Sequence, residues 1–197
     1  MKALEEKIVR EGAVLPGDVL KVGSFLNQQL DVAFLSEMGR EIARLFREDK
    51  VDRILTIEAS GIAIAFAAAV PLGVPVVIAK KSKAANQSGE MLSVEITSYT
   101  HKNTYFATVG ADYLPRGSRV LIVDDFLARG NALIGLTEML DRAGDSAADE
   151  ERGTDRDARL SDLALVLAVA EVDRRAASAD GAAEDSREVV EELEVLL

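Results

Sequence analysis

The sequence contains no cysteine, no tryptophan, a single histidine and no long apolar run. Without cysteine, disulfides, thiolate nucleophiles and cysteine-ligated metals are excluded, and with one histidine we expect no zinc site built by the protein. The apolar stretch 59–70 is shorter than the roughly 20 residues that a membrane-spanning helix needs. The first twelve residues lack the apolar core of a signal peptide. We therefore expect a cytoplasmic protein with no membrane contact.

The net charge of −11 is unevenly distributed along the chain. Residues 1–140 hold 17 acidic and 16 basic residues, whereas residues 141–197 hold 17 acidic and 7 basic residues. A sequence-independent grip on nucleic acid needs a clustered positive surface, which this balance does not provide. We expect no nucleic-acid partner and a strongly solvated acidic surface near the C-terminus.

Predicted helices and strands alternate along the chain, which favours a mostly parallel sheet covered by helices. The length of 197 residues suits one domain. The pattern predicts a turn at 71–75, an exposed polar loop at 145–161 and a terminal helix at 188–197. The other predicted elements are helices at 1–12, 33–46, 61–70 and 130–142, and strands at 19–22, 51–57, 76–79, 91–99, 104–109, 119–123 and 163–172.

The segment 120–132 carries the strongest chemical pattern. Four apolar residues form a buried strand, Asp124 and Asp125 follow at its carboxyl end, and a short loop then opens a helix. Ligands of open α/β sheets bind at such strand ends, and the helix start with its backbone N–H groups favours an anion. Two adjacent carboxylates can accept hydrogen bonds from vicinal sugar hydroxyls. The alternative is an ordinary turn with acidic caps.

Two further segments could bind an anion. Ala59, Ser60 and Gly61 follow a predicted strand and open a helix, so that backbone N–H groups and the serine hydroxyl could cradle phosphate, although such a serine is more often a simple helix cap. A lysine cluster that includes Lys81 follows the strand 76–79 and is either a solvated surface or a contact for diphosphate.

The sequence VLIVDDFLARGNA at 120–132 resembles the phosphoribosyl diphosphate (PRPP) motif of type I phosphoribosyltransferases. The resemblance implies that Asp124 and Asp125 contact the ribose hydroxyls, that the turn 59–61 is the diphosphate loop and that Lys81 contacts the diphosphate. It assigns the 5-phosphate to Ala128, Arg129, Gly130, Asn131 and Ala132. Residues 83–99 correspond to a mobile loop that closes over the site and excludes water.

The segment 20–31 resembles the purine-binding segment of bacterial xanthine phosphoribosyltransferases, with Leu20 and Asn27 at base-contacting positions. This implies transfer of the 5-phosphoribosyl group of PRPP to xanthine, with Mg²⁺ bound mainly through PRPP, in a homodimer. It also implies the α/β type I fold, with a small hood formed by N-terminal and C-terminal segments. We expect a single domain that spans residues 1–197. It begins with the hood and base-binding segment at 1–32, followed by the core with the PRPP site at 33–144. An acidic loop at 145–161 and a divergent C-terminal segment at 162–197 complete it.

The sequence departs from the family at two functional positions. Arg129 stands where the xanthine enzymes have a smaller polar residue, and Val172 stands where the family has a lysine that contacts the purine. Valine cannot donate a hydrogen bond to a base carbonyl. Two alternatives follow: a phosphoribosyltransferase for guanine, hypoxanthine or another base, or a PRPP-sensing regulator without catalysis.

Overall fold

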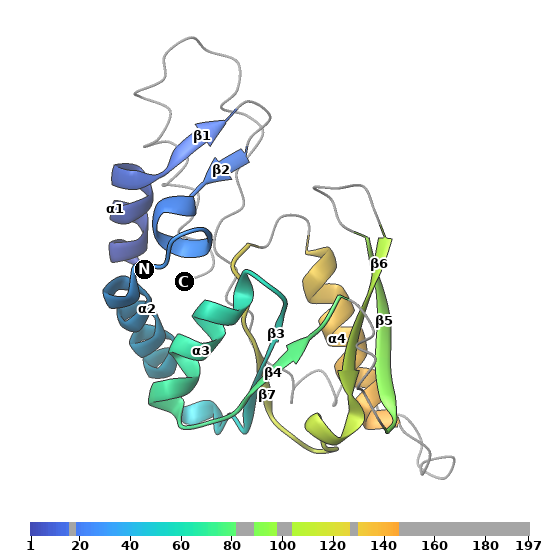
Figure 1. Cartoon of the computed structure of the whole chain (residues 1–197). Helices are drawn as coiled ribbons and strands as arrows, with labels where there is room; N and C mark the ends of the chain where they lie inside the picture. Colours follow the sequence, from blue (N-terminus) through green and yellow to red (C-terminus); the bar gives the residue numbers. More distant parts are fainter. Residues whose placement is uncertain (16–18, 82–88, 98–103, 127–129, 146–197) are drawn as a thin grey trace.

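A three-stranded parallel sheet forms the centre of the molecule (Figure 1). The computed structural model describes residues 1–15, 19–81, 89–97, 104–126 and 130–145. The strand order is β4 (Val76–Ala79), β3 (Arg53–Ile57), β7 (Val120–Ile122). Because all three strands run in the same direction, their carboxyl ends meet at one edge of the sheet.

Helix α3 (Gly61–Leu72) covers one face of this sheet, α2 (Val32–Leu45) packs on the outer side of α3, and α1 (Lys2–Glu11) lies next to α2 (Figure 1). Helix α3 contacts both β3 and α2, and its apolar residues join the strands in one buried cluster. The side chain of Asp31 caps α2 by accepting a hydrogen bond from the Phe34 N–H at 3.1 Å. The helical pattern of apolar residues in 33–46 therefore marks the face that α2 buries.

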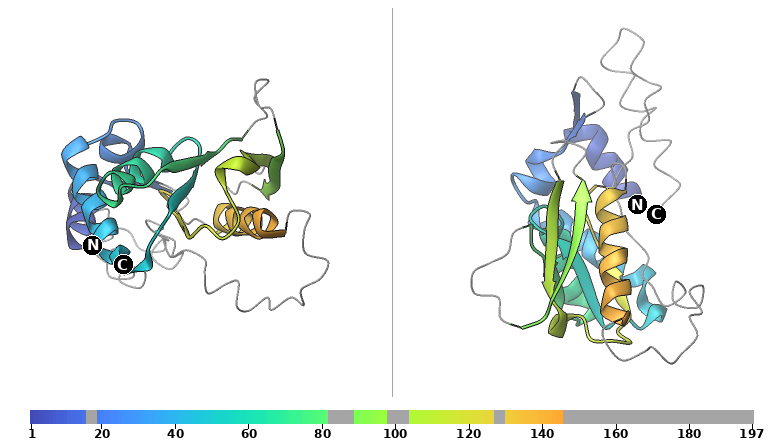
Figure 2. Two further views of the ribbon diagram at one scale, coloured as in Figure 1. Left: turned by 90° about the horizontal axis from the view of Figure 1, so that it is seen from below. Right: turned by 90° about the vertical axis from the view of Figure 1, so that its right-hand side faces the viewer.

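A β-hairpin and the last described helix cover the other face. The hairpin pairs β5 (Met91–Thr97) with β6 (Thr104–Gly110) in antiparallel register, and α4 (Asn131–Asp145) packs against β5. Lys80 and Thr108 join the hairpin to the end of β4 by two backbone hydrogen bonds of 2.9 and 2.8 Å. Figure 2 shows the resulting layers from two further directions.

The N-terminal elements form a separate small group. Strands β1 (Ala13–Leu15) and β2 (Val19–Lys21) pair antiparallel, and a π-helical turn, Gly23–Asn27, follows. The buried ammonium of Lys7 donates to Asp31 at 2.6 Å and lies 5.3 Å from the ring centroid of Phe25. This contact ties α1 to the π-helical turn and to the start of α2.

The alternation of helices and strands is confirmed, and three local predictions are wrong. Strand β1 is absent from the predicted elements, because three residues are too few to show alternation. The segment 23–30, for which the sequence pattern predicts a loop, contains the π-helical turn Gly23–Asn27, which is buried through Phe25 and Leu26. Pro71 lies in the last turn of α3 rather than in the following turn, and the helix ends at Leu72, with Gly73 as its C-cap at a φ of +71°.

Several predictions fall on residues that the structure does not describe. They are the acidic loop 145–161 after its first residue, the strand 163–172, the helix 188–197 and parts of the closing loop 83–99. Residues Met91–Thr97 of that closing loop form strand β5, which is paired along its whole length with β6.

Candidate active site

Three turns meet at the carboxyl edge of the sheet, one after each parallel strand. The hydroxyl of Ser60, in the turn after β3, donates a hydrogen bond of 2.8 Å to the Asp125 carboxylate, in the turn after β7. The Asp125 N–H in turn donates to the Asp124 carboxylate at 2.9 Å. The simple helix-cap interpretation of Ser60 is therefore wrong, because its hydroxyl makes no cap hydrogen bond to α3.

Gly61 lets the two turns come this close. A Cβ at this position would lie 2.3 Å from the Thr56 Oγ1 and 2.8 Å from the Asp124 Oδ1, well inside contact distance. Thr56 is fully buried beneath the turn, and Ala59, on its rim, is exposed. Glycine therefore allows helix α3 to begin directly beside the acidic pair.

The acidic pair is partly removed from water. Burial and the negative charge of Asp125 raise the pKa of Asp124 from 3.8 to about 7, and the positive charge of Lys81 opposes this shift. Asp125 is itself only 6% exposed. Two carboxylates held this closely, with helix N-termini nearby, form a site that can accept hydrogen bonds from hydroxyl groups.

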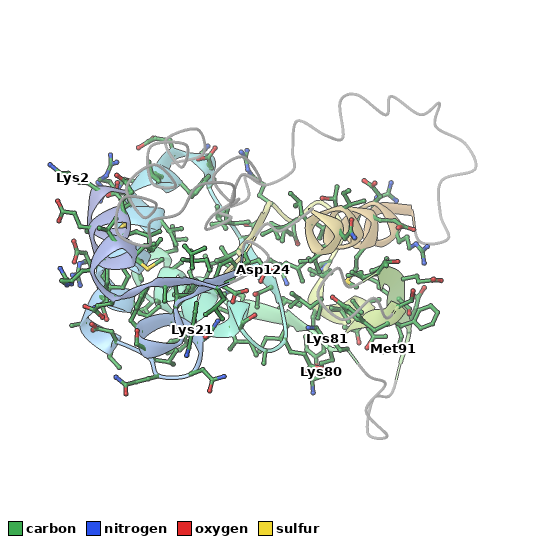
Figure 3. The ribbon with its side chains drawn as sticks, turned by 90° about the horizontal axis from the view of Figure 1, so that it is seen from above. Lys2, Lys21, Lys80, Lys81, Met91 and Asp124 are labelled. Carbon is green, nitrogen blue, oxygen red and sulfur yellow. The ribbon has the colours of Figure 1, made fainter. Side chains whose placement is uncertain are left out.

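Lys81 comes to the same edge from the end of β4. Its backbone N–H donates to the Glu58 carboxylate at 2.6 Å, and its ammonium lies 5.0 Å from the ring centroid of Tyr105 on β6. Viewed from above in Figure 3, Asp124 lies between the N-terminal elements and Lys81. The site thus combines two carboxylates with a nearby cation.

Helix α4 begins at this edge, at the end of the turn that follows β7. Gly130 has a φ of +73°, which favours glycine, and its carbonyl accepts from the Ile134 N–H at 2.9 Å. The Asn131 side chain donates to the Thr97 carbonyl at 2.9 Å and so ties the loop to the end of β5. Ala132 lies in the first turn of α4. Ala128 and Arg129 lie outside the described residues.

The two predicted base contacts lie in the N-terminal elements. Leu20 on β2 is partly buried against the core, and Asn27 ends the π-helical turn with its side chain exposed. Figure 1 shows these elements at the same end of the molecule as the start of α4. The Lys7 contacts hold this segment on the core through Phe25.

Sequence reasoning missed two residues that belong to this arrangement. Glu58 bonds to Lys81, and Tyr105 contacts its ammonium; burial and the charge of Asp124 raise the pKa of Tyr105. The sequence could have indicated Glu58 as a site residue, because it is the first polar residue after strand β3. Nothing in the sequence indicates a site role for Tyr105 beyond its place in an alternating strand, since its partner Lys81 is far away in the sequence.

Comparison with models of known protein families identifies the family to which the chain belongs. The model of the phosphoribosyl transferase domain family matches residues 27–146, which include all three turns of the site. The chain is a phosphoribosyltransferase. This match confirms the family indicated by the sequence at 120–132.

Curated relatives and solved structures agree with this phosphoribosyltransferase assignment. The chain is 48% identical over 146 residues to a xanthine phosphoribosyltransferase of Lachnoclostridium phytofermentans, covering 74% of this chain and 75% of the relative. It is 49% identical over 144 residues to a xanthine phosphoribosyltransferase of Clostridioides difficile, covering 73% and 76% of the two chains.

Solved structures of lower identity show the same fold. Adenine phosphoribosyltransferase from Thermoanaerobacter pseudethanolicus superimposes with a TM-score of 0.56 at 23% identity, over 71% of this chain and 81% of that one. The Saccharomyces cerevisiae enzyme gives 0.56 at 22% identity, over 73% and 84%. The predicted α/β type I phosphoribosyltransferase fold is confirmed.

Membrane spans and metal clusters are both missing from the described residues. No helix there is long and apolar enough to cross a membrane. Nor does this part of the phosphoribosyltransferase contain a group of three or more His, Asp or Glu side chains placed to hold a metal ion.

Proposed function

We propose that this enzyme transfers the 5-phosphoribosyl group of PRPP to xanthine, giving xanthosine 5′-monophosphate and pyrophosphate in purine salvage. The observation that carries the proposal is the identity of 48–49% to relatives named xanthine phosphoribosyltransferase, over about three quarters of each chain. The acidic pair beside Lys81 and two helix N-termini supports it, because PRPP presents a ribose diol and phosphate groups.

Asp124 and Asp125 are proposed to bind the ribose hydroxyls. As the bond between C1 and the diphosphate breaks, positive charge develops on the ribose ring, and a nearby carboxylate stabilises it. The Ser60 hydroxyl, at 2.8 Å from the Asp125 carboxylate, fixes the orientation of that side chain. These contacts would position the ribose, so the protein acts mainly through position and electrostatics.

The departing diphosphate is proposed to lie against Lys81 and the turn Ala59–Gly61, while the 5-phosphate binds the loop from Ala128 to Ala132. The start of α3 and the ammonium of Lys81 offset the negative charge of the diphosphate. Mg²⁺ would be held mainly by PRPP oxygens, which it prefers together with water, and would neutralise charge that develops on the leaving group.

The base is proposed to bind between the N-terminal segment, at Leu20 and Asn27, and the ribose site. Val172, in place of the lysine typical of the family, favours a second candidate in which the accepted base is guanine or hypoxanthine. The relatives' names support xanthine as the first choice.

The test is pyrophosphate release from PRPP and Mg²⁺ with xanthine, guanine, hypoxanthine and adenine offered separately. Release with xanthine alone is expected, and release with guanine or hypoxanthine alone would establish the second candidate. A D124N/D125N variant that keeps its fold should lose release by roughly two orders of magnitude or more. Near-normal turnover by that variant would contradict the assignment of the ribose site.

A homodimer and a cytoplasmic location are proposed with this function, by resemblance to the family. Helix α3 is apolar throughout, yet Phe66 and Val70 are each 65% exposed on it. Two large apolar side chains one helical turn apart fit a surface that a second copy covers. Light scattering of the full chain should give twice the monomer mass, and a monomer at micromolar concentration would contradict the dimer.

A further inference from the structure

Lys81 is fixed at its backbone by two separate elements. Its N–H donates to the Glu58 carboxylate at 2.6 Å, and the preceding residue, Lys80, exchanges two backbone hydrogen bonds with Thr108 of β6. These contacts determine where the lysine starts, but they do not direct its long side chain. An unrestrained lysine side chain samples many rotamers, and binding a ligand would have to order it.

The ring of Tyr105 directs that side chain. The Lys81 ammonium lies 5.0 Å from the ring centroid, within the range of a cation–π contact. Tyr105 is partly buried against the hairpin core, whereas Phe106, the next residue on the same strand, is 55% exposed. Successive side chains of a strand point to opposite faces, so Tyr105 is the aromatic residue of this pair that faces the site.

The Tyr105 side chain and the Lys81 ammonium both interact electrostatically with Asp124 of the acidic pair. The positive charge of Lys81 lowers the pKa of Asp124, and the negative charge of Asp124 raises the pKa of Tyr105. The ring contact and the hydrogen bond from the Lys81 N–H to Glu58 place this lysine at the same sheet edge as the carboxylates that are proposed to bind ribose.

We propose that Tyr105 is a positioning residue that holds the Lys81 ammonium ready for the diphosphate of PRPP. The inference rests on the proposed function, because it assigns a role within the same site. Holding the ammonium in place before the substrate arrives reduces the ordering that binding requires. Loss of the ring therefore weakens PRPP binding and leaves the binding of the base unchanged.

The variants Tyr105→Leu, Tyr105→Phe and Phe106→Leu separate this role from a structural one. Leucine keeps the apolar contact with the hairpin core, and phenylalanine keeps the ring. Tyr105→Leu is expected to raise the KM for PRPP about fivefold, which corresponds to the loss of one cation–π contact. Its KM for the base and its melting temperature should stay unchanged. Tyr105→Phe and the matched control Phe106→Leu should both retain the KM of the parent enzyme.

A double-mutant cycle with Lys81→Met provides the decisive result. In the Lys81→Met background, Tyr105→Leu should have no further effect on PRPP affinity, measured by calorimetry with PRPP and Mg²⁺. An equal effect of Tyr105→Leu in both backgrounds, or no effect in either, would overturn the role of Tyr105. If the parent protein bound no PRPP at all, the proposed function itself would fail, so the two failures are distinguishable.

Discussion

A side chain at Gly61 would disrupt the site. Because glycine has no Cβ, the narrow space between the fully buried Thr56 and the carboxylate of Asp124 stays free of side-chain atoms. Because Thr56 is fully buried and β-branched, its side chain has few rotamers available to make room. The start of α3 and the acidic pair can therefore lie side by side only if residue 61 is glycine.

Gly61→Ala is expected to abolish PRPP binding and to lower the free energy of unfolding by about 2 kcal/mol, a typical cost of overpacking. Urea unfolding and calorimetry with PRPP measure the two effects. The matched control is Gly144→Ala, because a Cβ at Gly144 in α4 meets no atom within 4 Å. That control should stabilise the protein by about 0.5 kcal/mol. A Gly61→Ala variant with normal affinity would contradict the packing argument.

The carboxyl group of Asp124 contributes less to the stability of the folded protein at neutral pH than at acid pH. Its pKa is raised from 3.8 to about 7, so between these values the folded state binds more protons than the unfolded state. Stability from this group is therefore lost as pH rises through that window, and the loss is complete above it. An asparagine in place of Asp124 could not ionise and would escape this loss.

We expect Asp124→Asn to raise the free energy of unfolding by about 1–3 kcal/mol at about pH 8 and to change it little at about pH 4. Urea unfolding at the two pH values measures the difference, and the same variant should lose activity. An unchanged or lower stability at the higher pH would show that the carboxylate is not disfavoured by its surroundings.

At the scale of elements, the contact between α2 and α3 depends on backbone approaching backbone. A Cβ on Gly39 of α2 would lie 2.1 Å from the Ala67 carbonyl oxygen of α3. Pro71, one turn later, has no N–H to offer that carbonyl. The carbonyl oxygen instead faces the Gly39 backbone, which explains how the last turn of α3 accommodates a proline.

Gly39→Ala is expected to cost about 3 kcal/mol of stability, because the clash is with backbone atoms that cannot rotate away. Thermal and urea unfolding measure the change. The Gly144→Ala variant again serves as control for the intrinsic effect of alanine in a helix. A loss below about 1 kcal/mol would mean that the two helices separate easily, contrary to the close contact.

At the scale of the whole molecule, the site is where the layers meet. The turn before α3 belongs to the helical layer, the start of α4 to the opposite layer, and Lys81 to the sheet edge that the hairpin joins. A ligand bound across these turns contacts each layer. Its binding energy therefore adds to the stability of the entire fold rather than of one loop.

PRPP with Mg²⁺ at about one hundred times its dissociation constant should stabilise the protein by about 2.7 kcal/mol. For a chain of this size that corresponds to a rise of roughly 5–10 °C in the unfolding temperature. Thermal unfolding with and without EDTA measures it, and chelation of Mg²⁺ should remove most of the rise. An equal rise in EDTA would show that PRPP binds without the metal.

The site was only partly predictable from the sequence. The acidic pair, the turn 59–61 and Lys81 each follow an apolar strand, so their convergence at one edge could be inferred from the rule that parallel strands share a direction. That the Ser60 hydroxyl binds Asp125 rather than capping α3 could not be inferred, because the two residues are 65 positions apart. The same holds for Tyr105 on β6, whose neighbour Lys81 follows the end of β4.

The order of the helices and strands, apart from β1 and the π-helical turn, follows from the sequence alone, because apolar spacing and breaker residues act locally. The sequence also determined the family, because the residues at 120–132 form one contiguous motif. Only the tertiary structure decided which side chains meet, how far Asp124 is removed from water and why Gly39 and Gly61 must lack a side chain. Those properties depend on distances between elements, and packing sets these distances only when the whole chain has folded.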